Sequence, residues 1–159
     1  MNILTARAMQ LTGVDRVKFN DAIADGHYTT PPEVDGKSRR FGDDDMAGLA
    51  AFGRLLELGI KVPLAASWAC AVVESFREHR TDLVSFHIVR TFDGRTFLLP
   101  FFGADKDEGR IAYDPDWLDK PNGTAALEIT IPVANIMADL YRRYRELHQA
   151  GHFKDDAAE

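Results

Sequence analysis

Residues 3–26 read ILTARAMQLTGVDRVKFNDAIADG and predict two short helices joined by a tight turn. Apolar residues recur at helical spacing in the first half, at Ile3, Leu4, Ala8 and Leu11. Gly13 ends this helix because glycine tolerates a left-handed backbone. Asp15 can cap a second helix, which ends at Asp25-Gly26. Its inward-facing residues should be Val17, Ala22 and Ile23. Two short helices around a glycine turn form the helix-turn-helix pattern.

Residues 27–42 predict a β-hairpin. Helical periodicity disappears here, and Pro31-Pro32 exclude a helix. Asp35-Gly36 is a turn signal between two stretches that can be extended. The densest basic cluster of the chain follows at Lys37, Arg39 and Arg40. His27 and Tyr28, just before the prolines, fit hinge and packing residues.

Two longer helices are predicted after the hairpin. The first covers residues 43–59, with three aspartates that complement the helix dipole at its start and Gly59 at its end. Its apolar stripe consists of Met46, Leu49, Ala50, Phe52, Leu55, Leu56 and Leu58. The second covers residues 63–78, and Pro63 is tolerated in its first turn.

The pattern changes to strands after Thr81. Residues 83–92 and 96–102 are rich in β-branched and aromatic side chains, and Asp93-Gly94 between them is a hairpin signal. Residues 127–131 predict another strand, and a short one is expected near residues 111–113. An amphipathic helix should run over residues 132–149. The fold class is therefore α+β, with a C-terminal antiparallel sheet and an amphipathic helix.

Composition is typical of a globular protein with an uneven charge distribution. The chain has 159 residues, 45% of them hydrophobic, and a net charge of −6. Residues 1–42 carry six basic and five acidic side chains, so the acidity lies further along the chain. We expect a first unit over residues 1–62, a connecting helix over 63–80, a second unit over 81–153 and a disordered tail over 154–159.

Several protein classes are not expected. The longest apolar stretch is too short to cross a bilayer and the start lacks a signal-peptide layout, which predicts a cytoplasmic protein. A lone cysteine, Cys70, excludes an intramolecular disulfide. The sequence contains no phosphate loop, nucleophile motif or paired His-Glu motif, so we expect no enzyme and no cofactor. His148, His152 and Asp155 have a ligand-like spacing, but Gly151 interrupts them and we expect no metal.

Three stretches resemble the DNA-binding region of the MerR family and the related excisionase-type winged helices. Residues 11–14, LTGV, look like the turn into that family's recognition helix. Residues 25–41, with two prolines and a basic run ending in RRF, look like its wing. Residues 41–60 look like the helix that follows, including a closing Leu-Gly-hydrophobic signature. The resemblance covers about residues 3–62 and implies an N-terminal winged helix-turn-helix.

Two departures limit what the resemblance implies. The Arg-Tyr-Tyr of many MerR-type recognition helices is replaced by Asn20-Asp21-Ala22, which is closer to excisionase-type helices. The long dimerisation helix of MerR regulators is missing at its usual place, because a strand pattern begins at about Leu83. MerR-type dimerisation and its promoter-untwisting mechanism are therefore not carried over.

The resemblance implies a sequence-specific regulator of transcription that binds duplex DNA. In a winged helix-turn-helix the second helix lies in the major groove and the wing contacts the backbone or the minor groove. Arg16 and Lys18 would then contact phosphate or guanine, and Asn20 could pair with an adenine edge. The wing residues Lys37, Arg39 and Arg40 would contact phosphates.

We expect a homodimer through the C-terminal unit, since two-fold dimers that read half-sites are common among such proteins. The sequence does not identify a small-molecule effector for the C-terminal unit. Two alternatives remain open. One is an architectural or recombination protein, of the phage excisionase or small terminase type, that uses the same residues to bend DNA. The other is a protein-interaction adaptor or antitoxin, in which neither residues 1–80 nor the full chain would retard DNA.

Overall fold

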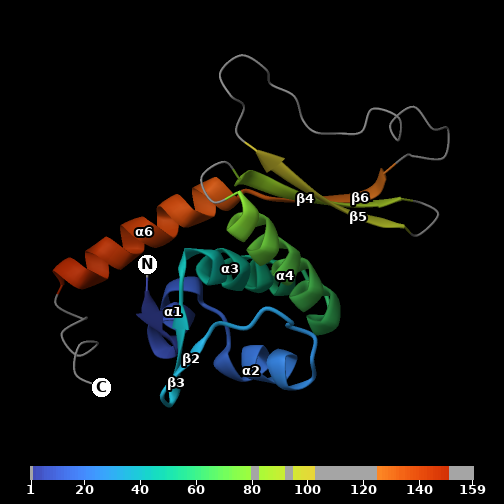
Figure 1. The fold of residues 1–159 in the computed structure, drawn as a ribbon. Helices are drawn as coiled ribbons and strands as arrows, with labels where there is room; N and C mark the ends of the chain where they lie inside the picture. The colour runs from blue at the N-terminus through green and yellow to red at the C-terminus, as the bar shows by residue number, and fades with distance from the viewer. Residues whose placement is uncertain (1, 80–82, 92–94, 103–124, 151–159) are drawn as a thin grey trace.

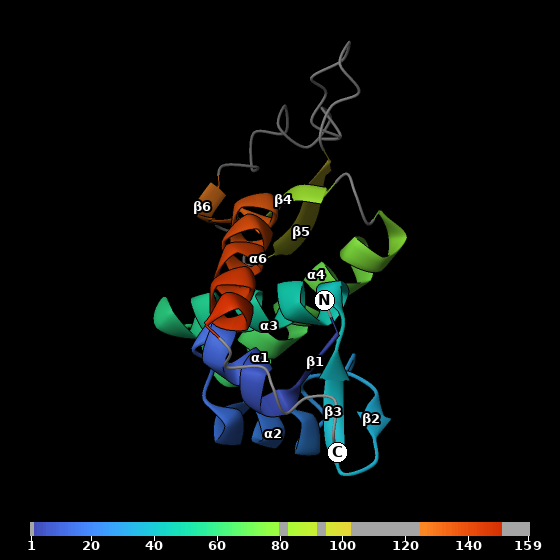
Figure 2. The ribbon, with the colours of Figure 1, turned by 90° about the vertical axis from the view of Figure 1, so that its left-hand side faces the viewer.

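The protein has a mixed α+β fold, as the sequence predicts. A computed structural model describes residues 2–79, 83–91, 95–102 and 125–150. Figures 1 and 2 show a three-stranded sheet at one end of the molecule, a layer of helices below it, and a short helix and a small hairpin at the other end. The predicted strand near residues 111–113, the Asp93-Gly94 turn and the tail over 154–159 lie outside the described residues.

The two predicted N-terminal helices form, each with the expected boundary signal. Helix α1 runs Thr5–Thr12 and ends at Gly13, whose φ of 72° is left-handed. Helix α2 runs Arg16–Ala24. Asp15 caps α2, because its carboxylate accepts hydrogen bonds from the backbone N–H groups of Val17 at 2.8 Å and Lys18 at 3.2 Å.

A small antiparallel sheet follows α2, and it corrects one expectation. Strands β2 (Val34–Asp35) and β3 (Ser38–Phe41) form the predicted hairpin. Ile3 and Leu4, expected at the start of the first helix, instead form strand β1 (Ile3–Leu4), which pairs with Phe41 and Arg40. The order is β1-β3-β2. Pairing with a strand so distant in sequence leaves no local signal, so helical spacing alone placed these two residues in the helix.

The helical layer is built on α3 (Asp43–Glu57) and α4 (Val62–Glu78). Asp45 closes the start of α3 by accepting a hydrogen bond from the N–H of Gly42 at 2.9 Å. Gly48 lets α3 and α4 approach closely: a Cβ at this position would lie 2.2 Å from a Val73 methyl carbon and 2.7 Å from the Tyr28 hydroxyl. Tyr28, 2% exposed, is therefore a packing residue.

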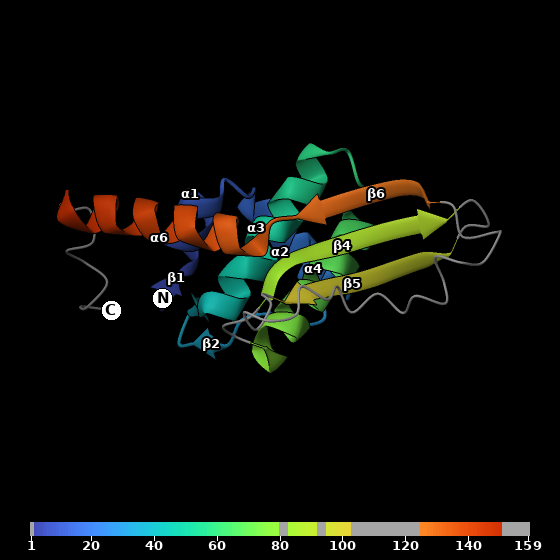
Figure 3. The same ribbon diagram turned by 90° about the horizontal axis from the view of Figure 1, so that it is seen from above.

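The C-terminal sheet has the order β5-β4-β6 and is antiparallel throughout. Its strands are β4 (Leu83–Thr91), β5 (Thr96–Phe102) and β6 (Ala125–Ile131). The pairing of Arg90 with Thr96 gives the hairpin predicted for β4 and β5. Central strand β4 buries Phe86 and Ile88. The sheet lies over α4, as the view from above shows (Figure 3).

Helix α6 (Val133–Gln149) links the sheet to the N-terminal elements. It contacts β4 and α3, and then extends away from the sheet along α1 (Figures 1 and 3). Among the described residues, buried apolar side chains from Ile3 to Leu140 form one hydrophobic core. The two predicted units thus share their packing, and the proposed boundary between them stays a prediction. None of the described helices has the length and apolarity needed to cross a membrane.

Candidate nucleic-acid interface

The orientation of α2 differs from the sequence expectation at one residue. Phe19 and Ala22 are fully buried, whereas Val17, expected to pack inward, is 66% exposed. At about 100° per residue, Val17 and Phe19 lie on opposite sides of the helix, so only one of them can face the core. The larger aromatic ring takes the inward side because three other aromatic rings surround it.

The predicted polar residues of α2 are brought to its solvent side. Arg16, Lys18 and Asn20 are all exposed. Arg16 and Lys18 are separated by about 200° around the helix axis, so they flank the exposed face on its two sides. Asn20 lies between them, one turn along from Arg16. This is an uncharged amide framed by two cations.

The three basic residues of the hairpin differ in solvent exposure and in their hydrogen-bond and ion-pair partners. Lys37 is exposed in the turn between β2 and β3, beside Gly36 with its φ of 62°. Arg39 is half-buried, and its guanidinium donates a hydrogen bond to the carbonyl of Pro32 at 3.3 Å. Arg40 forms an ion pair with Asp35 across the hairpin. Lys37 is therefore the most accessible cation of the three, and Arg40 has a neutralising neighbour.

An aromatic cluster fixes α2 against the hairpin. The ring of Phe19 lies 4.9 Å from that of Tyr28 in an edge-to-face arrangement, and 6.0 Å from those of Phe41 and Phe52. Phe41 is the last residue of β3 and Phe52 belongs to α3. One buried cluster thus joins α2, the hairpin and α3, so that the exposed side chains of α2 and the hairpin are held in a fixed relation.

The exposed side of α2 and the hairpin turn lie at the same end of the molecule, opposite the β5-β4-β6 sheet (Figures 1 and 2). This end is not uniformly basic. Asp21, Asp25 and Asp35 are exposed beside the cations. The arrangement can accommodate a polyanion along the first turn of α2 and the hairpin turn, but not across the acidic last turn of α2.

Behind the aromatic cluster, a partly buried polar group joins α3 to α4. Arg77 pairs with Asp44 and, at 3.2 Å, with Asp45. Burial raises the pKa of the Asp45 carboxyl, and the hydrogen bond from Gly42 only partly opposes this effect. Burial also raises the pKa of Tyr28 well above its ordinary value. Tyr28 is itself a ring of the aromatic cluster, and the charges of Asp45 and Arg77 act on the pKa of its hydroxyl in opposite directions.

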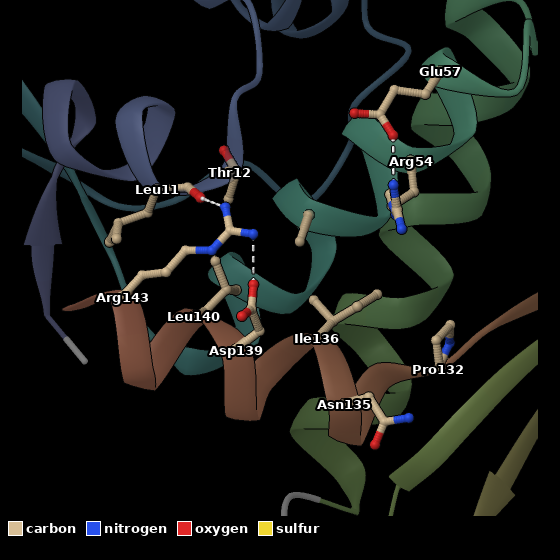
Figure 4. A pocket seen from close by; sticks show the side chains of 11 residues that line it. Leu11, Thr12, Arg54, Glu57, Pro132, Asn135, Ile136, Asp139, Leu140 and Arg143 are labelled. Atoms are coloured by element: carbon tan, nitrogen blue, oxygen red, sulfur yellow. Dashed lines mark hydrogen bonds and ion pairs between the residues drawn. The ribbon is translucent and has the colours of Figure 1, made fainter. Parts of the chain in front are cut away.

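A groove separates α6 from α1 and α3 (Figure 4). It has a volume of about 350 Å³. Arg143 lies on one side, where it pairs with Asp139 at 2.7 Å and donates a hydrogen bond to the Leu11 carbonyl at 3.5 Å. Arg54 and Glu57 pair on the other side at 2.8 Å. The charged side chains drawn at its rim thus form ion pairs with one another, so their charges are already neutralised without a ligand.

A second polar cluster lies on the C-terminal sheet. Ser85 Oγ is 2.9 Å from Nε2 of His87, and Nδ1 of that imidazole is 3.2 Å from Thr130 Oγ1. A hydroxyl beside an imidazole is the arrangement of an activated nucleophile. However, β4 pairs with strands on both sides, which engages backbone N–H groups that an oxyanion would need. We interpret the row as structural: the Ser85–His87 contact runs along β4, and the His87–Thr130 contact links β4 to β6.

In the described part of the chain, no three His, Cys, Asp or Glu side chains gather as a metal site would require. His152 and Asp155 lie outside it.

No protein-family model matches the chain, and no curated protein shows a significant sequence match. Sequence reasoning missed the exposed Val17 and the Arg40–Asp35 pair. Val17 and Phe19 are two residues apart, so a helix cannot bury both, and this spacing could have indicated that Val17 is exposed. The position of Asp35 across the hairpin from Arg40 could have indicated their ion pair.

Proposed function

We propose that this protein binds duplex DNA as a winged helix-turn-helix, with α2 in the major groove and the β2–β3 hairpin as the wing, and that it regulates transcription. One observation carries the proposal: the solvent side of α2 and the hairpin turn lie at one end of the molecule, fixed to one another by the packing of Phe19 on Phe41. A fixed relation between a helix and a hairpin is what simultaneous contact with a groove and the adjacent backbone needs.

Some of these side chains position the protein on the DNA backbone, and another reads a base. Arg16 and Lys18 flank the exposed face of α2, where they suit the phosphates on either side of a groove. Asn20 lies between them and suits the N6 and N7 atoms of adenine. In the wing, Lys37 contacts phosphate directly. Arg40 has to exchange its pairing with Asp35 for a phosphate, which lowers its net contribution.

The acidity of the chain fits a protein in which only one end meets DNA. The net charge of −6 arises beyond residue 42, and residues 1–42 carry one more basic than acidic side chain. Affinity for arbitrary sequences rests on cation–phosphate contacts and is therefore weak here. A regulator of this kind depends on base contacts for much of its affinity for a specific site.

We further propose that two copies act together as a homodimer through the C-terminal unit. The exposed face of a nine-residue α2 spans only a few base pairs, so a second copy doubles the sequence that is read. Tyr141, Tyr144 and Leu147 in the second half of α6 are only partly buried and can contribute to such an interface. Sedimentation at micromolar concentration should give twice the monomer mass, and a monomer in both free and DNA-bound states would contradict this.

Fluorescence anisotropy with random-sequence and genomic duplexes, measured over a range of salt concentrations, tests the DNA interface. The variant Arg16→Ala/Lys18→Ala/Lys37→Ala should bind all duplexes more weakly. Its plot of log K against log salt should be shallower by roughly 0.9 for each phosphate that is no longer neutralised. The matched control Lys61→Ala/Arg90→Ala/Arg95→Ala removes the same charge from exposed positions outside α2, the hairpin and α6, and should bind like the wild type.

The outcomes separate the proposed function from its alternatives. If the full chain binds no duplex at low salt, the DNA-binding proposal is wrong and a protein-interaction role is favoured. If both triple variants bind equally weakly, binding reflects total charge rather than the proposed interface. Strong bending of bound duplexes, measured by circular permutation of the site, would favour the architectural role over regulation.

A further inference from the structure

The exposed face of α2 is a single stripe with an apolar residue at its start. Four exposed residues follow the i, i+3, i+4, i+7 spacing that places side chains on one helix face: Val17, Asn20, Asp21 and Ala24. The stripe lies opposite the buried Phe19 and Ala22. Val17, 66% exposed, therefore stands beside Asn20 on the surface proposed to face the bases.

The charges along α2 determine which part of this stripe approaches DNA. Arg16 and Lys18 lie in the first turn, whereas Asp21 and Asp25 lie in or next to the last turn. Phosphates attract the first turn and repel the last. Helix-turn-helix proteins also contact base edges with the N-terminal residues of the second helix. The stripe residues that reach the bases are accordingly Val17 and Asn20.

We infer that Val17 determines part of the DNA specificity by packing on the C5-methyl group of a thymine. Thymine presents the one methyl group among the four bases in the major groove, and apolar side chains contact it. An apolar contact is the only base contact that Val17 can make, because its side chain neither donates nor accepts hydrogen bonds. The inference rests on the proposed function and names the base that this site selects.

The spacing of the stripe predicts where the thymine lies. Val17 and Asn20 are three residues apart, which is about 4.5 Å along the helix axis at about 1.5 Å per residue. Successive base pairs are about 3.4 Å apart. The thymine read by Val17 and the adenine read by Asn20 should therefore lie within one or two base pairs of each other.

Replacing thymine by uracil tests this inference, because it removes the methyl group and nothing else. Duplexes bound by the wild-type full chain are first selected from a random library, and each thymine of the consensus is then replaced in turn. The expected result is one thymine in each half-site whose replacement weakens wild-type binding about fourfold. This equals about 0.8 kcal/mol for one buried methyl-sized group at about 1.4 kcal/mol per factor of ten.

Because a homodimer carries the substitution in both subunits, Val17→Ala should lose about as much affinity as replacing the thymine in both half-sites, about fifteenfold, and be insensitive to uracil at those positions. Val84→Ala is the matched control: Val84 is 38% exposed on β4, at the opposite end of the molecule, and its variant should respond to uracil like the wild type. If a consensus is selected but every thymine tolerates uracil, or if Val17→Ala keeps the methyl effect, the inference is wrong while DNA binding stands. If no duplex is selected, the proposed function itself is refuted and the inference with it.

Discussion

Phe19→Ala should strongly destabilise the protein, whereas Val17→Ala, two positions away on the same helix, should not. Phe19 is 0% exposed and packs against three aromatic rings, while the Val17 side chain faces solvent. The pair compares the inward and outward sides of α2 within one turn. It therefore tests the face assignment on which the proposed interface depends.

The expected magnitudes differ by several-fold. Removing a fully buried phenylalanine ring costs about 3–5 kcal/mol, including the cavity that is left and the loss of edge-to-face packing on Tyr28. With a urea m value of about 2 kcal/mol/M, the midpoint of unfolding should fall by about 2 M. Val17→Ala should change the free energy of unfolding by less than about 0.5 kcal/mol, since it removes little buried surface and alanine favours the helix.

Urea unfolding followed by far-UV circular dichroism measures both variants against the wild type. The m value has to stay constant for the midpoints to be compared. If Val17→Ala costs as much as Phe19→Ala, or if Phe19→Ala costs less than about 1 kcal/mol, then α2 does not present the face described above. In that case Asn20 and its flanking cations lose their proposed role as well.

Two further predictions concern the support behind α2. Gly48→Ala should lower the free energy of unfolding by about 1–3 kcal/mol through overpacking against Val73 and Tyr28. Gly53→Ala should have a much milder effect in thermal melts, because the one close contact of its new Cβ is a Val14 methyl carbon at 2.8 Å. Equal effects would contradict the close approach of α3 to α4. Because burial raises the pKa of Asp45, the folded state binds its proton more tightly than the unfolded state, so this group's contribution to stability grows as pH falls from its raised pKa towards about 3.9. Asp45→Asn should remove that component from the pH dependence of the urea midpoint, and an unchanged slope would show that Asp45 is not the group responsible.

Local signals were enough to predict most of the secondary structure. Asp15, Gly13 and Gly59 mark helix boundaries through capping and left-handed backbone, and each does so in the structure. The two hairpins follow turn residues flanked by strand-forming stretches. These features depend on neighbours within a few positions, which is why periodicity and turn chemistry identify them.

Features set by distant partners were not predictable in the same way. Helical spacing in a nine-residue segment is compatible with Val17 or Phe19 facing inward, and the choice depends on Phe41 and Phe52 in later elements. The groove beside α6 depends on Arg143 reaching the carbonyl of Leu11, 132 positions earlier. At the candidate interface, residue types indicated the basic positions, but only the fold shows that Asp35 neutralises Arg40 while Lys37 stays accessible.

The central claim is that one end of the molecule, made of α2 and the β2–β3 hairpin, binds duplex DNA. Amide chemical-shift perturbation of the 17.8 kDa chain, titrated with a selected duplex at low salt, tests it most directly. The claim predicts that the largest shifts fall in residues 15–24 and 36–40, with small shifts in β4 and β6. Shifts concentrated on α6 or the β5-β4-β6 sheet, or none at saturating duplex, would contradict it.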